Sequence, residues 1–363
     1  MNITYATREE LLIRIQQGPF NRPIILLDED GARRWGLIDY LQSPSMPGRW
    51  VSTFLPNPTQ DSVFQVREEI GEFSADGLIA IGGGSTIDMA KAISALNTMG
   101  VGSSDQIKQA IVEKTYVDNA ANALPIIAVP TTAGTGSEVT SWATIWDAQS
   151  SAKYSIDAHW IKPVQAWIVP DLLASLPAHL ALTTGLDATS HATEAYWAKA
   201  SNPLVKALSI RALQILVPHL KYGIHHLDDP ATRETLATGS LLAGMAFSMT
   251  RTTACHALSY PMTSMHQVPH GLACAMTLGP VADLNSQVCD LSELLAVFAP
   301  YGGIQVWVDD VCDGIVVPRL SHFGITKHDI GTLAAQSQTP GRADNNPAQL
   351  SVDVAQDVLL SVL

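Results

Sequence analysis

Four side chains that can bind a divalent metal occur as two pairs in the second half of the chain. The first pair is Asp187 and His191, four positions apart in GLDATSHATEAY, with no Gly or Pro between them. On a helix this spacing places both side chains on one face, one turn apart. We therefore expect Asp187 and His191 to point at the same ion.

The second pair is His256 and His270, fourteen positions apart. A straight helix would separate them by roughly 21 Å at about 1.5 Å per residue, too far to share one ion. Pro261 and Pro269 are predicted to break that helix, and Gly271 follows His270, so the chain can fold back. This reversal would bring the two imidazoles together.

The two pairs would supply three imidazoles and one carboxylate, a sensible ligand set for Zn²⁺ or Fe²⁺. The Irving–Williams order favours Zn²⁺ in such a site, so occupation by Fe²⁺ would depend on supply. The alternative is that these side chains bind nothing, because the chain has eleven His and most histidines in proteins are not ligands. Spacing alone leaves this alternative open.

A glycine-rich turn in the first half has the composition of a phosphate-binding loop. Gly82, Gly83, Gly84 and Ser85 follow the apolar run GLIAI and open the helical pattern TIDMAKAISAL. Glycines let the backbone approach a pyrophosphate, and a helix N-terminus offers free N–H groups and a favourable dipole. The motif is not GxGxxG, because Ile87 stands at the third glycine position, and a plain tight turn remains the alternative.

A second glycine-rich loop, TTAGTGSE at residues 131–138, follows the apolar run LPIIAVP. Two such loops at the carboxyl ends of strands in one sheet indicate a dinucleotide site. Asp28, at the end of PIILLD, is predicted to accept hydrogen bonds from an adenosine ribose. The alternative role for Asp28 is a helix cap before DGARRWG.

Continuously apolar runs in the first half indicate parallel strands that are buried on both faces. The runs are residues 23–27, 77–81, 124–129 and, with a weaker signal, 165–169. Helical patterns at residues 62–73 and 86–96 lie between them. This alternation predicts an α/β domain with a doubly wound parallel sheet.

From about Pro177 the strand signal disappears, and long Ala- and Leu-rich stretches with helical periodicity follow. Examples are residues 180–199, 204–222 and 231–247. The sequence therefore predicts a dinucleotide-binding α/β domain over residues 1–175 and an all-α, metal-binding helical domain over residues 176–363. Because no low-complexity linker separates them, we expect the two domains to share a tight cleft.

Composition narrows the class of protein. The chain has 363 residues, 47% of them hydrophobic and 15% charged, which is enough for two cores. A formal net charge of −13 argues against nucleic acid or an acidic membrane surface as the main partner. The sequence has no signal-peptide pattern, no apolar run of transmembrane length and no CxxC, so we expect a cytoplasmic protein with Cys255 in its core.

Four ordered segments, GGGSTIDMAKAIS, PTTAGTGSEVT, GLDATSHATEAY and the His256…PHG arrangement, resemble the iron-containing (group III) alcohol dehydrogenases. The match runs from about Pro23 to the C-terminal NNP segment. The resemblance implies a NAD-dependent enzyme, with NADP possible, that interconverts an aldehyde and a primary alcohol. It also implies one divalent metal, Fe²⁺ or Zn²⁺, held by Asp187, His191, His256 and His270. We further expect a homodimer.

The resemblance assigns cofactor and substrate positions residue by residue. It implies that the cofactor contacts Asp28, Asn57, Gly83, Gly84, Ser85, Asp88, Thr131, Thr132, Thr135 and Lys153. Within this set, Asp28 would favour NAD by repelling a 2′-phosphate, and Lys153 would contact the cofactor near the chemistry. Thr140 and Phe247 match substrate-pocket positions.

The chain departs from the family pattern around the substrate. The family usually has His-x-x-x-His before PHG, whereas here the segment reads His256-Ala-Leu-Ser-Tyr260. Tyr260 is the candidate to replace the missing histidine in a proton relay, although a neutral phenol is a poor base near pH 7. Trp142 occupies a pocket-lining stretch usually filled by something smaller.

Cationic and hydroxyl side chains accompany these departures. Arg251, Thr252 and Thr253 precede the metal histidine, and Lys162 replaces a usual apolar residue. This pattern is similar to the branch that handles phosphonoacetaldehyde and 2-hydroxyethylphosphonate, and a helix there would set Arg251 over a turn from His256. Alternatively, Arg251 and Lys162 are ordinary solvated charges.

Two other activities stay open at this stage. One is a general dehydrogenase for short-chain alcohols or diols. The other is an NAD-binding lyase of the dehydroquinate synthase type, which would bind NAD without net redox chemistry. The PHG and GxDAxxH motifs favour the dehydrogenase.

Overall fold

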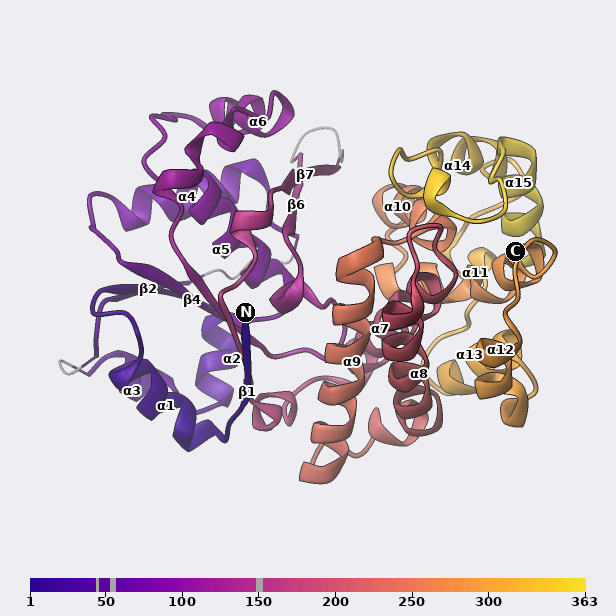
Figure 1. The fold of residues 1–363 in the computed structure, drawn as a ribbon, viewed down its shortest axis with the longest axis horizontal. Coiled ribbons are helices and arrows are strands. Elements are labelled where there is room, and N and C mark those ends of the chain that lie inside the picture. The colour runs from indigo at the N-terminus through magenta and orange to yellow at the C-terminus, as the bar shows by residue number, and fades with distance from the viewer. Residues whose placement is uncertain (44–45, 53–56, 148–152) are drawn as a thin grey trace. The chain divides into compact units, whose positions relative to one another are not determined.

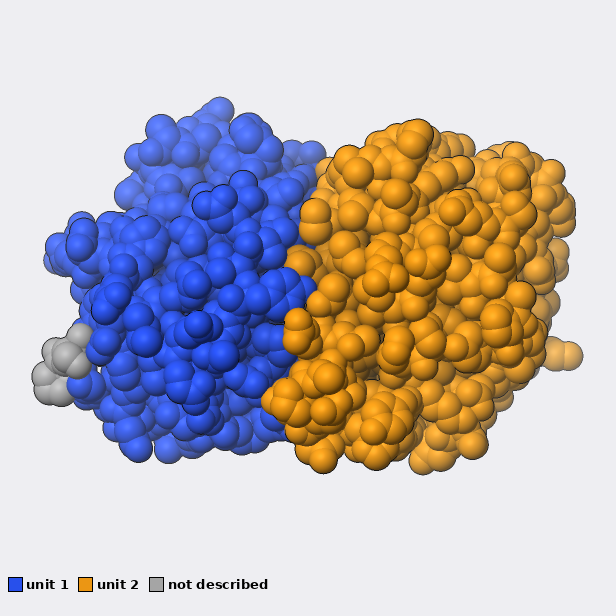
Figure 2. All heavy atoms as spheres, turned by 60° about the horizontal axis from the view of Figure 1, so that its bottom comes forward, with its two compact units in different colours: residues 1–132, 137–175 blue, residues 133–136, 176–363 orange. Residues whose placement is uncertain are grey.

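The computed structural model of the chain describes residues 1–43, 46–52, 57–147 and 153–363. The chain divides into two compact units (Figure 2). Unit 1 comprises residues 1–132 and 137–175, and unit 2 comprises residues 133–136 and 176–363. Among the described residues, no helix combines the length and apolar character needed to cross a membrane.

Unit 1 is built on a six-stranded sheet in which every pairing is parallel (Figure 1). The strand order is β1-β8-β5-β4-β2-β3. The strands are β1 (Asn2–Tyr5), β2 (Pro23–Leu27), β3 (Arg49–Ser52), β4 (Gly77–Gly82), β5 (Ile126–Pro130) and β8 (Gln165–Ile168). A separate antiparallel pair consists of β6 (Trp142–Trp146) and β7 (Lys153–Asp157). The parallel sheet confirms the predicted fold class.

The side chains of β2 explain why the central strands are continuously apolar. Ile24 and Leu26 belong to one buried cluster, whereas Ile25 and Leu27 belong to another. Because alternate residues of a strand face opposite sides, both faces of the sheet are covered. The strands missed by the sequence analysis, β1, β3, β6 and β7, all contain half-buried or exposed positions and so lack a continuous apolar run.

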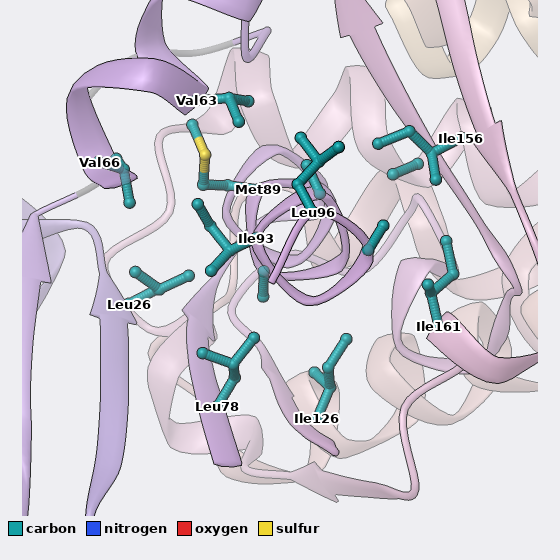
Figure 3. Packing of buried hydrophobic residues seen from close by; sticks show 14 of the residues in the cluster. Leu26, Val63, Val66, Leu78, Met89, Ile93, Leu96, Ile126, Ile156 and Ile161 are labelled. Carbon is teal, nitrogen blue, oxygen red and sulfur yellow. The ribbon is translucent and has the colours of Figure 1, made fainter. Parts of the chain in front are cut away.

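Helices of unit 1 form one of these clusters against the sheet. Figure 3 shows Ile93 of α5 pointing toward Leu26 of the sheet and Met89 pointing toward Val63 of α4. The helices are α1 (Arg8–Gln17), α2 (Glu29–Arg34), α3 (Ile38–Leu41), α4 (Gln60–Ile70), α5 (Gly84–Ala95) and α6 (Ser104–Val112). The two helices predicted in this unit are α4 and α5, with ends shifted by one to three residues.

Unit 2 consists of helices and the loops between them, with no strand among its described residues. Its helices are α7 (Ala178–Trp197), α8 (Pro203–Gly223), α9 (Pro230–Thr250), α10 (Ala254–His266), α11 (His270–Asn285), α12 (Ser292–Phe298), α13 (Ile304–Cys312), α14 (Ile330–Gln336) and α15 (Val352–Ser361). Asn202 and Asp229 cap α8 and α9, each followed by a proline that suits a first helical turn. The predicted helices at 180–199, 204–222 and 231–247 are α7, α8 and α9.

The prediction that Pro261 breaks the helix is wrong. Pro261 lies inside α10, which continues to His266, because burial of one helix face outweighs the lost backbone hydrogen bond. The chain reverses instead at Gln267, which has φ of 57°, and Val268 N–H donates to the carbonyl of Met262. This reversal brings the start of α11 back alongside α10.

Candidate functional site

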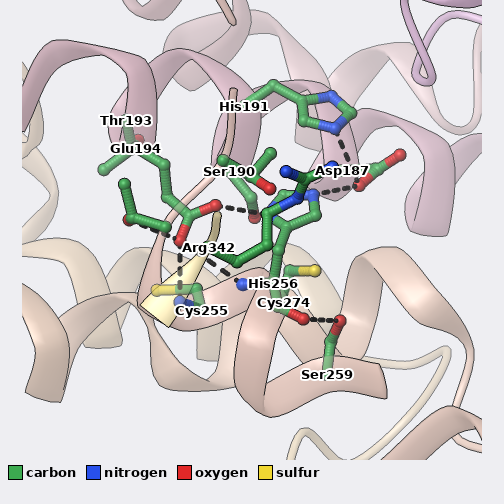
Figure 4. Close-up of polar contacts among 12 residues, drawn as sticks. Asp187, Ser190, His191, Thr193, Glu194, Cys255, His256, Ser259, Cys274 and Arg342 are labelled. Carbon is green, nitrogen blue, oxygen red and sulfur yellow. Dashed lines mark hydrogen bonds and ion pairs between the residues drawn. The ribbon is translucent and has the colours of Figure 1, made fainter. Parts of the chain in front are cut away.

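The four predicted metal ligands converge in unit 2 around one carboxylate oxygen, and Figure 4 shows three of them, Asp187, His191 and His256. Asp187 Oδ1 lies 3.7 Å from His191 Nε2, 3.4 Å from His256 Nε2 and 4.0 Å from His270 Nε2. Four donors at about 2.1 Å from one ion in a tetrahedron are about 3.4 Å apart. The observed separations therefore suit ligands of a single metal ion after small adjustments.

The second nitrogen of each imidazole is held by the protein. His191 Nδ1 lies 3.2 Å from the carbonyl oxygen of Gly134, and His256 Nδ1 contacts the carboxylate of Glu194. His270 Nδ1 lies 3.2 Å from Ser259 Oγ, whose hydroxyl donates to a backbone carbonyl and so accepts from the histidine. Each Nδ1 therefore carries a proton, and Nε2 is the ring nitrogen that faces Asp187 and would bind a metal.

Two buried atoms at this centre test whether a metal fits. Among the residues that the structure describes, Asp187 Oδ1 and His256 Nε2 find no hydrogen-bond partner, although their residues are only 6% and 2% exposed. A buried polar atom left unpaired costs about 1–3 kcal/mol. A cation would satisfy both atoms at once, so the residues fit a divalent metal held by nitrogen and oxygen donors.

The charge states of two of the free ligands, His191 and Asp187, also suit a cation. Burial lowers the pKa of His191 to about 4, although Asp187 acts in the opposite direction. Burial alone would raise the pKa of Asp187, but the surrounding histidines outweigh it and hold that pKa below its ordinary value. His191 is thus neutral and Asp187 ionised near neutral pH, the forms in which each binds a metal.

Glu194 is a functional residue that the sequence analysis missed. Its buried carboxylate accepts hydrogen bonds from Thr253 Oγ1 at 2.8 Å and from Cys255 N–H at 2.7 Å, and contacts His256 Nδ1. Burial would raise the pKa of Glu194, but His256 and Thr253 lower it below its usual value. The sequence spacing could have identified Glu194, because it lies three positions after His191 and therefore on the ligand face of α7.

Two predicted residues lie beside the ligands in unit 2. The ring of Phe247 stacks on His191 with centroids 3.9 Å apart and an interplanar angle of 3°. The ring of Tyr260 is parallel to His270, with centroids 5.9 Å apart. Both side chains can therefore shape the space next to the metal.

Arg251 differs from its predicted setting. It ends α9 with φ of 66° and ψ of −176°, and a separate helix, α10, starts at Ala254. The expectation of one helix through Arg251 and His256 is therefore wrong. The physical reason is that Arg251 and Thr253, which lie between the two helices, both have non-helical backbone angles.

The predicted cofactor segments of unit 1 follow three neighbouring strands. β2 and β4 pair Leu27 with Ile81, and β4 and β5 pair Gly82 with Pro130. Asp28, the glycine turn and Thr131 therefore leave the same edge of the sheet, where ligands of doubly wound folds bind. Thr131 N–H donates to the carbonyl of Gly82, which ties the two loops together.

The glycine turn opens α5 as expected. Gly83 is its N-cap residue, and Gly84 and Ser85 form its first turn. A Cβ atom at Gly82 would lie 2.3 Å from Thr86 Oγ1, so glycine is needed for this close approach. Asn57 N–H donates to Ser85 Oγ at 3.1 Å, which brings these two predicted cofactor residues together.

Two predicted cofactor carboxylates have partners within the protein. Asp28 caps α2 by accepting from Asp30 N–H at 3.1 Å, and its other oxygen lies 3.6 Å from Arg34. Asp28 therefore has the cap role weighed above, and its effect on cofactor choice stays a prediction. Asp88 accepts from Ser137 Oγ at 2.6 Å and from Thr144 N–H at 2.8 Å, so it anchors the second loop.

A buried lysine connects the predicted substrate residues of unit 1. Lys91 Nζ donates to Thr140 Oγ1 at 3.0 Å and to the carbonyl oxygen of Trp142 at 2.8 Å. Burial lowers the pKa of Lys91 to about 8, although the carboxylates of Asp88 and Glu138 act in the opposite direction. Lys153 pairs with Trp146 across β6 and β7.

The remaining predicted cofactor residues lie on the second loop. Thr132 ends a stretch of unit 1, and its side chain would be 3.3 Å from a Cβ atom at Gly83. Thr135 belongs to the short piece of that loop assigned to unit 2. In that piece, a Cβ atom at Gly134 would lie 2.6 Å from Thr184 of α7, which explains the glycine beside the His191 contact.

Comparison with known proteins finds aldehyde reductases and alcohol dehydrogenases among the relatives of this chain. A phosphonoacetaldehyde reductase from Streptomyces viridochromogenes is 33% identical over 311 residues, covering 80% of this chain and 77% of the relative. An NAD-dependent methanol dehydrogenase from Bacillus methanolicus is 33% identical over 315 residues, covering 83% of this chain and 81% of the relative. A crystal structure of sulfoacetaldehyde reductase from Bifidobacterium kashiwanohense in complex with NAD⁺ superposes with a TM-score of 0.84 at 26% identity, over 100% of this chain and 96% of that one.

Two family models cover most of the chain. Residues 9–169 match the family described as iron-containing alcohol dehydrogenase, and residues 181–363 match the C-terminal domain of the same family. These matches are to dehydrogenases, which answers the lyase alternative. The chain therefore belongs to the iron-containing alcohol dehydrogenase family.

Proposed function

We propose that this enzyme reduces a small anionic aldehyde, most specifically phosphonoacetaldehyde, to its primary alcohol with NADH. The family implies an oxidoreductase that uses a nicotinamide cofactor and a divalent metal. Two of the relatives are named for aldehydes that carry a phosphonate or a sulfonate group. The observation that carries the proposal is a strained arginine, Arg251, in the short connection between α9 and the helix of His256.

Arg251 has a backbone conformation that normally requires glycine. Its φ of 66° and ψ of −176° cost a non-glycine residue about 1–3 kcal/mol. The surrounding structure maintains this conformation: Arg251 N–H donates to the carbonyl of Phe247, and Asn345 Nδ2 donates to the carbonyls of Thr250 and Thr252. An arginine kept where glycine would relieve strain supports a role for its side chain.

A second guanidinium belongs to the same region of unit 2. In Figure 4 the half-buried Arg342 side chain extends toward Asp187 and the ring of His256. Its backbone carbonyl accepts from Asn345 N–H, so Arg342 lies on the segment that holds the Arg251 turn. A guanidinium that extends toward the metal ligands favours a substrate with a negatively charged group.

The chemistry divides between the bound groups and the chain. When bound, the metal polarises the substrate oxygen as a Lewis acid, and the nicotinamide carries the hydride. Asp187 and the three histidines would hold the metal, and Phe247 limits the space on one side of His191. A guanidinium fork matches two phosphonate oxygens at once, whereas an ammonium offers a point charge.

The test compares two aldehydes and two variants. We expect wild-type kcat/KM to be higher for phosphonoacetaldehyde than for propionaldehyde. Arg251→Ala should lower kcat/KM about 10–150-fold for the anionic aldehyde, the range for losing a charged hydrogen bond of 1.5–3 kcal/mol, and change it little for propionaldehyde. Arg251→Lys should restore it only in part.

Equal wild-type kcat/KM for the two aldehydes would refute the proposal. It would leave a general short-chain alcohol dehydrogenase, the activity suggested by the similarity to methanol dehydrogenase.

A further inference from the structure

The metal centre contains a donor that is absent from the four-ligand set. Cys274 lies on α11, four positions after His270 and hence one turn along the same helix face. Its side chain is fully buried and forms no disulfide. One donor atom each from Asp187, His256, His270 and Cys274 all lie within 4.8 Å of one another.

The centre therefore offers two sets of four donors that share three members. Asp187, His256 and His270 are common to both sets, and the fourth donor is either the imidazole of His191 or the sulfur of Cys274. The unpaired atoms Asp187 Oδ1 and His256 Nε2 belong to the shared part. Either fourth donor would complete a four-coordinate site.

The two sets differ in softness and in charge. A thiolate is a soft ligand that favours Zn²⁺, whereas imidazole suits Zn²⁺ and Fe²⁺ alike. With His191, one carboxylate leaves a divalent ion with a net charge of about +1; with Cys274, carboxylate and thiolate together neutralise it. In a buried site the neutral set loses less solvation free energy.

We propose that Cys274 is a metal ligand of this enzyme and makes the centre select Zn²⁺ over Fe²⁺. The metal–sulfur bond forms as the S–H bond breaks, and the proton leaves to solvent, so no electron is transferred. The proposal rests on the metal centre and does not depend on which aldehyde the enzyme reduces.

Cys255 provides the matched control. It is as fully buried as Cys274 and adjoins the ligand His256 in the sequence, but it is not among the four converging donors. Its contact with the site is through its backbone N–H, which donates to Glu194 and which a serine would preserve.

The experiment replaces the metal and observes the sulfur. Chelated holoenzyme is reloaded with Co²⁺ or Zn²⁺, and metal content, near-ultraviolet absorption and zinc X-ray absorption are recorded. We expect a thiolate-to-cobalt charge-transfer band in wild type and Cys255→Ser and its loss in Cys274→Ser. The zinc enzyme should show a scatterer at about 2.3 Å, the Zn–S distance, in addition to nitrogen and oxygen at about 2.0–2.2 Å.

A pair of further variants separates the two fourth donors. His191→Ala should keep stoichiometric Zn²⁺ with sulfur bound, whereas His191→Ala combined with Cys274→Ala should lose it. Circular dichroism of each variant establishes that the fold is retained, and Cys274→Ala replaces Cys274→Ser if the serine protein does not fold.

Absence of sulfur from the zinc and cobalt spectra of the wild type would overturn the proposal. Equal Zn²⁺ affinity and equal Zn²⁺-over-Fe²⁺ selectivity of wild type and Cys274→Ser would overturn it as well. The anionic-aldehyde proposal would survive either result, because its test measures substrate preference.

Discussion

Removing the charge of Glu194 should weaken metal binding without removing a ligand. The carboxylate fixes the proton of His256 on Nδ1 and so leaves Nε2 free for the metal. In Glu194→Gln the amide can still accept from Thr253 and Cys255, but its NH₂ group then faces His256 Nδ1. The imidazole must give up this hydrogen bond or move its proton to Nε2, where it blocks the metal.

The expected loss of metal affinity follows from this geometry. Loss of such a partner costs about 10–100-fold in metal affinity, which is about 1.4–2.7 kcal/mol. The assay is competition for Zn²⁺ against a chelator of known affinity, with circular dichroism to establish folding. His270→Ala, which removes a ligand, should lose metal altogether and nearly all turnover, and Glu234→Gln, an exposed carboxylate on α9, should behave as wild type.

The relative metal affinities of two variants provide a second test of the role of Glu194. Thr253→Ala removes one of the hydrogen bonds to Glu194 and leaves its charge, so it should weaken binding less than Glu194→Gln. If Glu194→Gln binds Zn²⁺ within about twofold of wild type, the inference that Glu194 sets the tautomer of His256 is wrong.

Two further predictions concern unit 1. Asp28→Asn keeps a side-chain acceptor for the α2 cap but removes the negative charge. The ratio of kcat/KM with NADH to that with NADPH should therefore be smaller in this variant than in the wild type. A wild type that strongly prefers NADPH would contradict this prediction. Burial raises the pKa of Glu138 to about 7, so the native state holds its proton more tightly than the unfolded chain, and stability falls as pH rises from about 4.5 to 7. In the wild type, the free energy of unfolding measured in urea should fall by up to about 3 kcal/mol between pH 5 and pH 7.5, and Glu138→Gln should abolish this fall. Parallel pH profiles of the unfolding free energy for the two proteins would refute the prediction.

Sequence reasoning is most accurate where a local pattern determines the outcome. The central strands such as β2 are continuously apolar because both faces are buried, and this property is visible in single runs of residues. The edge strand β3 reads RWVS with one buried residue, so its identity depends on pairing with β2. The spacing of Asp187 and His191 likewise suffices to place them one turn apart.

The parts that escaped prediction depend on tertiary contacts. Pro261 indicates a helix break by its own chemistry, yet packing keeps α10 intact through it. Glu194 and Cys274 each lie one turn from a predicted ligand, but their significance depends on which side chain of another helix meets them. Spacing within one helix cannot supply that information.

The short piece Ala133–Gly136 limits how this protein can be divided. The chain crosses between its two units at residues 132/133, 136/137 and 175/176. A fragment starting at residue 176 would contain all four candidate ligands but would lack Gly134, the carbonyl acceptor of His191 Nδ1. The helical unit is therefore not an independent module that recombination or truncation can exchange at one junction; a functional transplant must carry two separate stretches of gene.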